Sequence, residues 1–441
     1  MLADPIGLLG RRLEDIVDES VGIVRSVQEV PREAGAPDFF HYAARAADTS
    51  AFGGLQNFGN TGGASVRREV AIAKAVGEGV ERYSAALYTA RRLPLVSYAE
   101  ADFPCVRPDA FALHSPDQYD SPGFPWAPFD EDAPIRWTPA LDLASWRVTY
   151  VPAAFTWIPY RFDQGQGETP IGQPISTGLA CHETWARSAL GGVCEAIERD
   201  AFTLMWQRRL SLPQIRVETL SDANYDLVQR FERTGDGVRL INLTTDVGVP
   251  VVLSVLRSEA AGRPAHVFAA SADPDPEQAV RKALEELAHT RRYAEQVLKW
   301  MPCPSHEDDW AEVETQAHHL RLAADPTTRK PYEFVFASRE RIDFEALPTA
   351  VRGDAETRLA AVARALTAAG ISTYVADLTS PDVRGLGLSV TRTLAPGLNP
   401  LFMGHRLRAL GGRRLAQAPE RYAGAGLPAD GGLNSLPHPY P

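Results

Sequence analysis

Two segments of the chain repeat the same spacing of two glutamates and one arginine. They read GEGVERYSAAL at residues 77–87 and CEAIERDAFTL at residues 194–204. The repeated residues are Glu78, Glu81 and Arg82 in the first segment and Glu195, Glu198 and Arg199 in the second. On a helix this spacing places both carboxylates on one side with the arginine beside them. An exposed ion pair of this kind is worth only about 0.2–0.5 kcal/mol, so the repetition is what indicates a site.

The surroundings of the two triplets favour a site for metal and phosphate. Both lie among small and apolar residues, where a carboxylate needs a cation or hydrogen-bond donors to offset its desolvation. Two acidic clusters brought together repel each other unless a divalent cation lies between them, and Mg²⁺ takes oxygen ligands along with substrate phosphate oxygens. Arginines add forked donors for phosphate. The residues therefore predict a nucleoside triphosphate and Mg²⁺ bound by helix side chains.

Three expected helices position these side chains. The first follows Ser65, a candidate N-cap after a glycine pair, and extends to about Tyr88. The second is capped by Thr184 and continues past Arg199. The third opens with Asp275 as the cap and a proline at the first helical position. Its polar residues of interest are Glu285, Glu286, His289, Arg291 and Arg292.

The rest of the chain alternates strand-like and helical patterns, which predicts an α/β or α+β fold with mixed sheets. The strand-like runs are 21–25, 148–158, 238–243, 249–256, 265–270, 333–337, 372–377 and 387–393. A Pro- and Asp-rich stretch at 100–136 is expected to be irregular. From about Gly411 the chain is rich in Gly and Pro and ends in LPHPYP, so neither a helix nor a central strand is expected there.

Composition excludes several classes of function. A formal charge of −11 opposes binding to nucleic acid or an anionic membrane surface. No apolar run approaches the roughly 20 residues of a membrane span. The four cysteines show no CxxC pair or zinc-ligand spacing and the N-terminus has no secretory pattern, which predicts a cytoplasmic protein without disulfides. Neither GxxxxGK[ST] nor GxGxxG after a strand occurs, so a P-loop or Rossmann nucleotide site is not expected.

Three motifs resemble those of YcaO-domain proteins. The segment STGLACHETWARSALGGVCEAIERDA at 176–201 is similar to the central motif of that family. The segments AIAKAVGEGVERYSA at 71–85 and ALEELAHTRR at 283–292 are similar to its first and third ATP-site motifs. The resemblance extends from Ser20 to the final prolines. It implies a YcaO-type fold that binds ATP and Mg²⁺ among these helices and activates a peptide amide oxygen.

The resemblance also implies roles for individual residues. Those implied to hold Mg²⁺ and phosphates are Glu78, Glu81, Glu195, Glu198 and Glu286. Those implied to contact the nucleotide are Ser20, Lys74, Arg82, Ser176, Arg199, His289 and Arg291. Spacing puts Arg291 on a different helix face from Glu286, so its role rests on the resemblance alone, and Ser176 is equally suited to capping its own turn. The chain departs from the family pattern at Gly62, Gly63, Lys74, Glu183, Ala186 and His289.

The ending PHPYP resembles the PxPxP terminus of the azoline-forming cyclodehydratases of the family. Its residues Pro437, Pro439 and Pro441 are implied to bring the terminal carboxylate to the reaction centre, whereas composition alone favours a disordered tail. The implied enzyme converts Cys, Ser or Thr of a ribosomal precursor peptide to thiazoline or oxazoline by ATP-dependent phosphorylation of the amide oxygen. Alternatives are a thioamide- or amidine-forming YcaO enzyme, an acyl-phosphate ligase, and a catalytically silent scaffold that positions peptide.

Domain limits and partners complete the expectations. We divide the chain into an N-terminal segment at 1–60, an ATP-binding core at 61–400 and a Gly/Pro-rich tail at 401–441. The resemblance implies a homodimer and a separate E1-like or ocin-ThiF-like protein that binds the leader of the precursor, with a flavin dehydrogenase as a further candidate partner. Because the YcaO-like pattern occupies the chain from Ser20 onward, no additional leader-binding domain of roughly 50 residues is expected within it.

Overall fold

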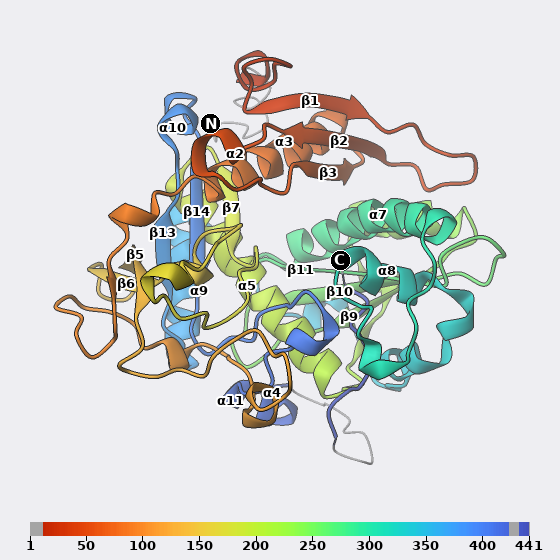
Figure 1. The fold of residues 1–441 in the computed structure, drawn as a ribbon. Coiled ribbons are helices and arrows are strands. Elements are labelled where there is room, and N and C mark those ends of the chain that lie inside the picture. The colour runs from red at the N-terminus through yellow and green to blue at the C-terminus, as the bar shows by residue number, and fades with distance from the viewer. Residues whose placement is uncertain (1–11, 423–431, 441) are drawn as a thin grey trace.

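In the computed structural model, which describes residues 12–422 and 432–440, the chain forms three β-sheets with helices packed against them (Figure 1). One sheet has the strand order β1-β2-β3 and another the order β11-β10-β9-β8-β12. The third has the order β4-β5-β13-β14-β7, with β6 also paired to β5. The pair β8 and β12 is parallel, and the other strand pairs of the described residues are antiparallel. The predicted α/β class with mixed sheets is confirmed.

The strands and helices have the following bounds. The strands are β1 Val24–Glu29, β2 Phe40–Ala46, β3 Asn60–Ser65, β4 Leu95–Val96, β5 Ile135–Asp142, β6 Val148–Pro152, β7 Leu179–His182, β8 Gln214–Ile215, β9 Gly237–Asn242, β10 Val251–Arg257, β11 His266–Ala272, β12 Arg341–Ile342, β13 Tyr374–Asp377 and β14 Ser389–Leu394. The helices are α2 Ser50–Gly53, α3 Arg68–Ala85, α4 Pro116–Tyr119, α5 Trp185–Gln207, α6 Asp222–Glu232, α7 Pro276–Trp300, α8 Gln316–Ala324, α9 Ala355–Ala368, α10 Pro381–Gly385 and α11 Arg413–Ala416.

Helix α3 packs against β2 and β3 of the three-stranded sheet. Its side toward the protein interior buries small residues, among them Ala71 and Ala75. The approach is close because Gly63 of β3 has no side chain. A Cβ atom there would lie 2.5 Å from the Cβ of Lys74 and 2.7 Å from the carbonyl oxygen of Ala71. Gly63 therefore holds α3 and its polar side chains at a fixed distance from the sheet.

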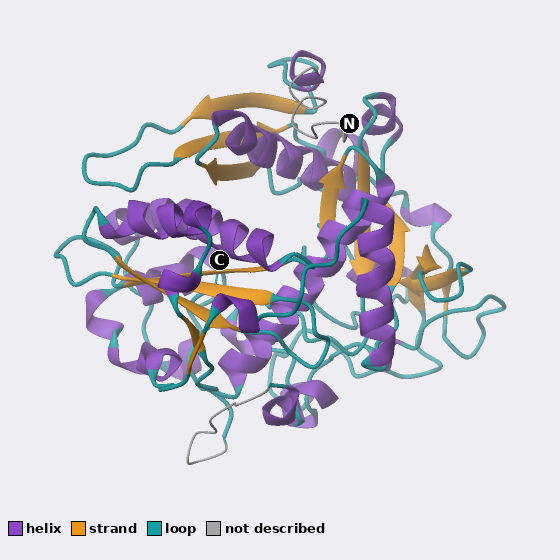
Figure 2. Ribbon diagram, turned by 180° about the vertical axis from the view of Figure 1, so that it is seen from behind, coloured by secondary structure: helices purple, strands orange, loops and turns teal. Residues whose placement is uncertain are grey.

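Helix α5 lies between the two larger sheets (Figure 2). It contacts β7 and β14 of one sheet and β10 and β11 of the other, and most of its residues are buried. Helix α7 covers β10 and β11, with α6 and α8 beside it. The predicted caps are confirmed, since the side chain of Thr184 accepts from the N–H of Arg187 and that of Asp275 accepts from the N–H of Glu277. The charged residues of α5 are thus held inside the molecule.

Three local predictions are wrong. Residues 333–336 of the predicted strand 333–337 belong to the 3₁₀ helix Lys330–Phe336, in which a proline at the start favours a helical turn over a strand. Ser65 ends β3 and does not cap the first helix, whose N-cap is Arg67. The segment after Gly411 contains the short helix α11. Among the described helices, none has both the length and the apolar character needed to cross a membrane.

Candidate active site

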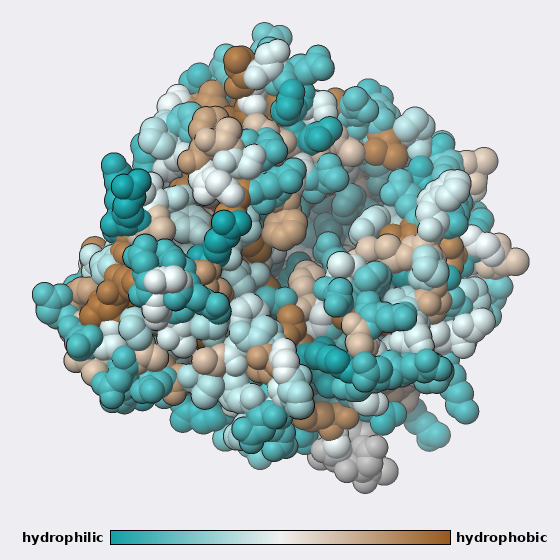
Figure 3. All heavy atoms as spheres, viewed as in Figure 1, coloured by the Kyte–Doolittle hydropathy of each residue, from teal (hydrophilic) through white to brown (hydrophobic). Residues whose placement is uncertain are grey.

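A cleft of about 1050 Å³ is bounded by β2, β3 and α3 on one side and by α7 on the other, with α5 contributing from within the fold. Figure 3 shows the surface hollowed near the middle of the molecule, where the gap between these elements lies in Figure 1. Residues of all three predicted motifs line it. The predicted site residues found there are Lys74, Glu78, Glu81, Arg82, Ser176, Glu195, Glu198, Arg199, Glu286 and His289.

The triplet of α3 forms one wall. The Nη2 atom of Arg82 donates to Oε1 of Glu78 over 3.2 Å, and its Nε lies 3.9 Å from Oε1 of Glu81. Burial raises the pKa of Glu81 to about 8, with the nearby Glu195 contributing to the increase and Arg82 opposing it. A cation that binds beside such a group stabilises the ionised carboxylate, so that its proton is released to solvent.

The triplet of α5 repeats this arrangement deeper in the protein. The Nε of Arg199 lies 3.3 Å from Oε1 of Glu198, and its Nη2 lies 3.7 Å from Oε1 of Glu195. Burial raises the pKa of Glu198 to about 7, with Arg199 opposing and the neighbouring Glu195 and Glu286 adding to the increase. Acids from α3, α5 and α7 therefore act on one another across the cleft.

The acidic residues fit Mg²⁺ only in company with other ligands. Within the part of the chain that the structure describes, no three His, Cys, Asp or Glu side chains stand close enough together to hold a metal ion alone. Mg²⁺ usually keeps several waters and binds through one or two carboxylates together with substrate phosphates. Scattered buried acids with raised pKa values and paired arginines match that mode of binding better than a closed metal cage.

Lys74 and His289, two departures from the family pattern, occupy defined places in the cleft. The Nζ of Lys74 donates to Oε2 of Glu285 over 2.7 Å, and Ser65 Oγ donates to the other carboxylate oxygen over 2.7 Å. This pair joins α3 to α7. The ring of His289 lies against Gly62, where a Cβ atom would come within 2.4 Å of it. Glycine at position 62 is thus required by the close approach of the imidazole.

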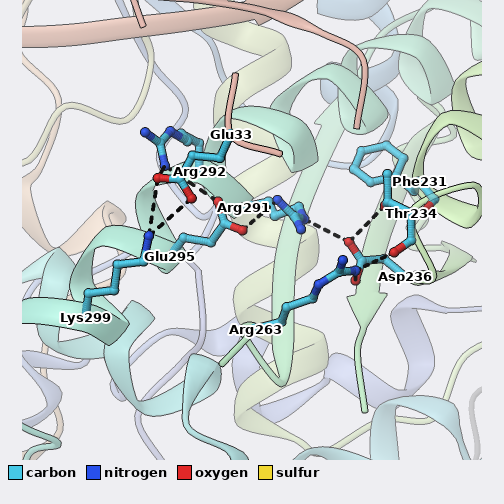
Figure 4. A network of polar contacts seen from close by, with 9 residues as sticks. All are labelled: Glu33, Phe231, Thr234, Asp236, Arg263, Arg291, Arg292, Glu295 and Lys299. Atoms are coloured by element: carbon cyan, nitrogen blue, oxygen red, sulfur yellow. Dashed lines mark hydrogen bonds and ion pairs between the residues drawn. The ribbon is translucent and has the colours of Figure 1, made fainter. Parts of the chain in front are cut away.

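The structure places two predicted nucleotide residues away from the cleft. Arg291 is 3% exposed, its Nε donates to Oδ2 of Asp236 over 2.9 Å, and its Nη1 lies 2.9 Å from Oε1 of Glu295 (Figure 4). Arg291 thus forms buried structural ion pairs on a different face of α7 from Glu286, as its spacing indicated. Ser20 is exposed, and its backbone N–H donates to the Asp18 carboxylate.

The C-terminal tail enters the site. Pro437 and Pro439 are buried, and Pro441 lies outside the described residues. Tyr440, which follows Pro439, is 2% exposed, and its hydroxyl donates to Oε1 of Glu198 over 2.6 Å. The guanidinium of Arg199 lies 4.4 Å from the centre of the same ring. For residues 432–440 the alternative of a disordered tail is therefore wrong.

Two residues in or beside the cleft are not among those predicted from the sequence. Tyr440 is the single Phe, Trp or Tyr residue of PHPYP, which is a signal available in the sequence. Arg392 lines a cavity beside the cleft and interacts electrostatically with Glu81 and Glu195. The alternation of Val390, Arg392 and Leu394 along β14 puts one charge on an otherwise apolar strand face, and that irregularity is a signal available in the sequence.

Comparison with known proteins agrees with this geometry. Residues 62–399 match the family described as YcaO cyclodehydratase, ATP- and Mg²⁺-binding. The chain belongs to the YcaO family. Its description names the two cofactors that the residues predicted. A protein encoded in the tfuA 3′ region of Rhizobium leguminosarum bv. trifolii is 33% identical over 169 residues, which is 36% of this chain and 39% of that relative.

Solved structures of YcaO proteins share the fold. A heterocyclase in complex with substrate and cofactor has a TM-score of 0.74 and 21% identity, covering 99% of this chain and 57% of that one. The YcaO protein of Methanopyrus kandleri bound with AMPPCP and Mg²⁺ has a TM-score of 0.65 and 20% identity, covering 90% and 91%. The E. coli microcin synthetase McbBCD complex with pro-MccB17 bound has a TM-score of 0.58 and 14% identity, covering 87% of this chain and 91% of that one. This YcaO chain thus corresponds to only part of the first relative and of the heterocyclase.

Proposed function

We propose that this YcaO protein is an ATP-dependent cyclodehydratase that forms thiazoline or oxazoline rings from Cys, Ser or Thr of a ribosomally made peptide. The observation that carries the proposal is the burial of residues 437–440 of the PHPYP motif, where Tyr440 lines the acidic cleft and donates to Glu198. The tail motif resembles that of the azoline formers, and the cleft has the acids and arginines suited to a nucleoside triphosphate.

In the proposed reaction the side-chain thiol or hydroxyl loses its proton to solvent as it attacks the preceding amide carbonyl carbon. The former carbonyl oxygen takes the γ-phosphoryl group of ATP, and that oxygen then leaves as phosphate together with the amide proton, so that the ring gains its C=N bond. Phosphoryl transfer of this kind depends mainly on positioning and on neutralisation of charge. ADP and phosphate form with each ring.

Different residues of the cleft are suited to different parts of this reaction. Glu78, Glu81 and Glu198 are suited to hold Mg²⁺, which neutralises phosphate charge when it is bound. Arg82 and Arg199 keep the acids in place and offer further donors to phosphate oxygens. Tyr440 of the buried tail lines the cleft, where its ring occupies space that water would otherwise fill.

The direct test is mass spectrometry of peptide treated with the protein, ATP and MgCl₂, using candidate precursor peptides encoded near its gene. Azoline formation removes one water for each modified residue and consumes one ATP. Exchange of oxygen for sulfur, or condensation with an amine, would replace the proposal with thioamide or amidine formation. Absence of ATP binding would instead indicate a silent scaffold, and ADP formed only with an added amine and a carboxylate would indicate an acyl-phosphate ligase.

We also propose that the protein acts with a separate E1-like or ocin-ThiF-like protein that binds the leader of the peptide. Tethering through a leader raises the local concentration of substrate without new contacts at the site. The McbBCD structure, in which a relative of this fold lies in a complex with a precursor, supports the proposal. Phosphate release should rise markedly when the partner is added. Efficient, leader-dependent turnover by the isolated chain would contradict it.

A further inference from the structure

A second cavity adjoins the cleft, and we call it the side cavity. It encloses about 100 Å³, and Ile175, Thr177 and Leu401 line both it and the cleft. Most of its walls are apolar. The apolar residues include Phe111, Leu113, Phe155, Leu394, Leu398 and Phe402. Since a dry apolar cavity of about 150 Å³ takes a benzene ring, this one is sized for a branched aliphatic side chain.

Arg392 of β14 also lines the side cavity and is 2% exposed. Its Nε and Nη1 atoms have no hydrogen-bond partner among the described residues. The charged groups that act on it are Glu81, Glu195 and Arg82 of the cleft. Burial lowers its pKa to about 10, which leaves the guanidinium charged at neutral pH. Arg392 therefore lies where the side cavity meets the acidic cleft.

A buried guanidinium with two unpartnered nitrogen atoms is costly for a fold. Burying charge or leaving donors unsatisfied lowers stability, and the great majority of buried polar groups find a partner. The strand face itself offers Val390 and Leu394, which have no acceptor side chains. An acceptor supplied by a ligand would account for an arginine at this position.

We propose that the side cavity binds an apolar side chain of the substrate peptide while Arg392 donates to a backbone oxygen of the same residue. An amino-acid residue carries its side chain and its carbonyl group on one α-carbon, so a single residue can fill the cavity and reach the guanidinium. Because the side cavity opens beside the cleft, this residue flanks the one that is modified. The inference rests on the proposed function only in taking the ligand to be a peptide.

The test uses small probes and no ATP, so that it does not depend on the reaction. N-acetyl-leucinamide represents an internal peptide residue and N-acetyl-leucine a chain end with its carboxylate. Ligand-observed NMR should give a dissociation constant of about 1 mM for the better of the two. N-acetyl-alaninamide should bind at least about tenfold more weakly, because the loss of even one methylene from an apolar pocket weakens binding by about tenfold or more. Equal binding of the leucine and alanine probes would overturn the proposal.

Two variants locate the probe. Ala409→Leu fills the side cavity and should weaken N-acetyl-leucinamide by about tenfold or more, whereas Ala416→Leu on exposed α11 should not. Arg392→Met should weaken it similarly, whereas Arg384→Met at an exposed ion pair should not. Unchanged binding in Ala409→Leu would exclude the cavity, and unchanged binding in Arg392→Met would exclude the arginine.

The melting temperature of the Arg392→Met variant distinguishes a ligand-binding role of Arg392 from a structural one. Since Nε and Nη1 of Arg392 have no acceptor among the described residues, Arg392→Met should keep or raise the melting temperature. If it fails to fold, the arginine is structural and that half of the proposal is wrong, while Ala409→Leu still tests the cavity. If the protein does not hydrolyse ATP but binds the probe as expected, the proposed reaction fails and the peptide site remains.

Discussion

At the scale of single residues, the arginines of the three motifs have different surroundings. Arg82 and Arg199 lie in the cleft against pairs of glutamates. Arg291 is buried on the far side of α7 with Asp236 and Glu295. The same residue type thus lies in the acidic cleft in two motifs and in the core of the fold in the third.

The acids of the cleft should be required for nucleotide binding. Glu78→Gln or Glu198→Gln should weaken Mg²⁺-dependent ATP binding by about 10–100-fold, because each removes a ligand to the cation that balances the cluster. Folding should survive. Isothermal titration with MgCl₂ and a non-hydrolysable ATP analogue measures the effect. Glu69→Gln, at an exposed position of α3, is the control and should bind as the parent does.

Arg291 should matter for stability and not for the nucleotide. Arg291→Met should lower the free energy of unfolding by about 3–5 kcal/mol, because it leaves the carboxylate of Asp236, 1% exposed, with a weaker set of partners. ATP affinity in the folded fraction should be unchanged. Asp343→Asn, which breaks an exposed ion pair with Arg216, should cost about 0–1 kcal/mol. A tenfold loss of ATP affinity in Arg291→Met would restore the role implied by the family resemblance.

His266 of β11 should make the protein sensitive to acid. It is buried beside Tyr332 and Phe336, and neither ring nitrogen has a partner among the described residues. Burial, and then Arg257 and Arg329, lower its pKa to about 4. The ring is neutral in the folded state, so the stability that it contributes is fully present above the unfolded pKa of about 6.5. This stability is lost progressively as the pH falls below that value and through the folded pKa of about 4.

His266→Phe should therefore reduce acid sensitivity. Between about pH 8 and about pH 5, the parent should lose about 2 kcal/mol through this residue, and the variant should not. Denaturant unfolding at the two pH values gives the difference. An identical loss in both proteins would show that His266 is not the group that titrates.

At the scale of elements, the C-terminal tail is part of the core. The indole Nε1 of Trp206 donates to the carbonyl oxygen of Leu436 over 3.1 Å, and the rings of His319 and His438 are stacked at 3.8 Å. Tyr440 packs on Phe202 of α5 with ring centres 4.5 Å apart. A disordered tail, which composition alone favours, would have contributed little to stability. The tail instead joins α5 to the sheets.

Removal of residues 437–441 should thus affect both folding and the site. We expect a loss of about 3–5 kcal/mol or more, since the deletion empties space filled by a buried aromatic ring. Tyr440→Phe keeps the ring and removes the hydroxyl, which donates to Glu198 and accepts from the N–H of Ala270, so it should cost about 1–3 kcal/mol and alter Mg²⁺-dependent ATP binding. A truncated protein with the parent melting temperature would contradict the observed burial of the tail.

At the scale of the whole molecule, ion pairs hold the two sides of the cleft together. Lys74 of α3 bonds Glu285 of α7, and Arg292 Nη1 donates to Glu33 of the segment before β2 over 2.7 Å. These contacts connect the three-stranded sheet to the helix layer of the five-stranded sheet. The width of the cleft is thus set by side chains from both sides.

The pair between Lys74 and Glu285 should show measurable coupling. A double-mutant cycle with Lys74→Met and Glu285→Gln should give an interaction energy of about 0.5–3 kcal/mol, because Glu285 is almost fully buried and Lys74 is partly so. The exposed pair of Arg384 and Asp377 should give less than about 1 kcal/mol. Equal coupling in both cycles would mean that the pair across the cleft does not fix the two sides.

The sequence by itself determined the features that depend on near neighbours. Helical spacing, the caps Thr184 and Asp275 and the repeated triplets follow from contacts within a few residues, and they sufficed for the fold class, the family and most of the cleft residues. Tertiary structure alone decided which sides of the helices meet. Arg291 lies away from the cleft because α7 presents that face to Asp236, and Tyr440 enters the cleft because the tail returns to α5 from far along the chain. Arg392 comes within electrostatic reach of Glu81 and Glu195 because β14 packs against α3 and α5. Burial and the pKa shifts it causes depend on such long-range packing, which local spacing does not encode.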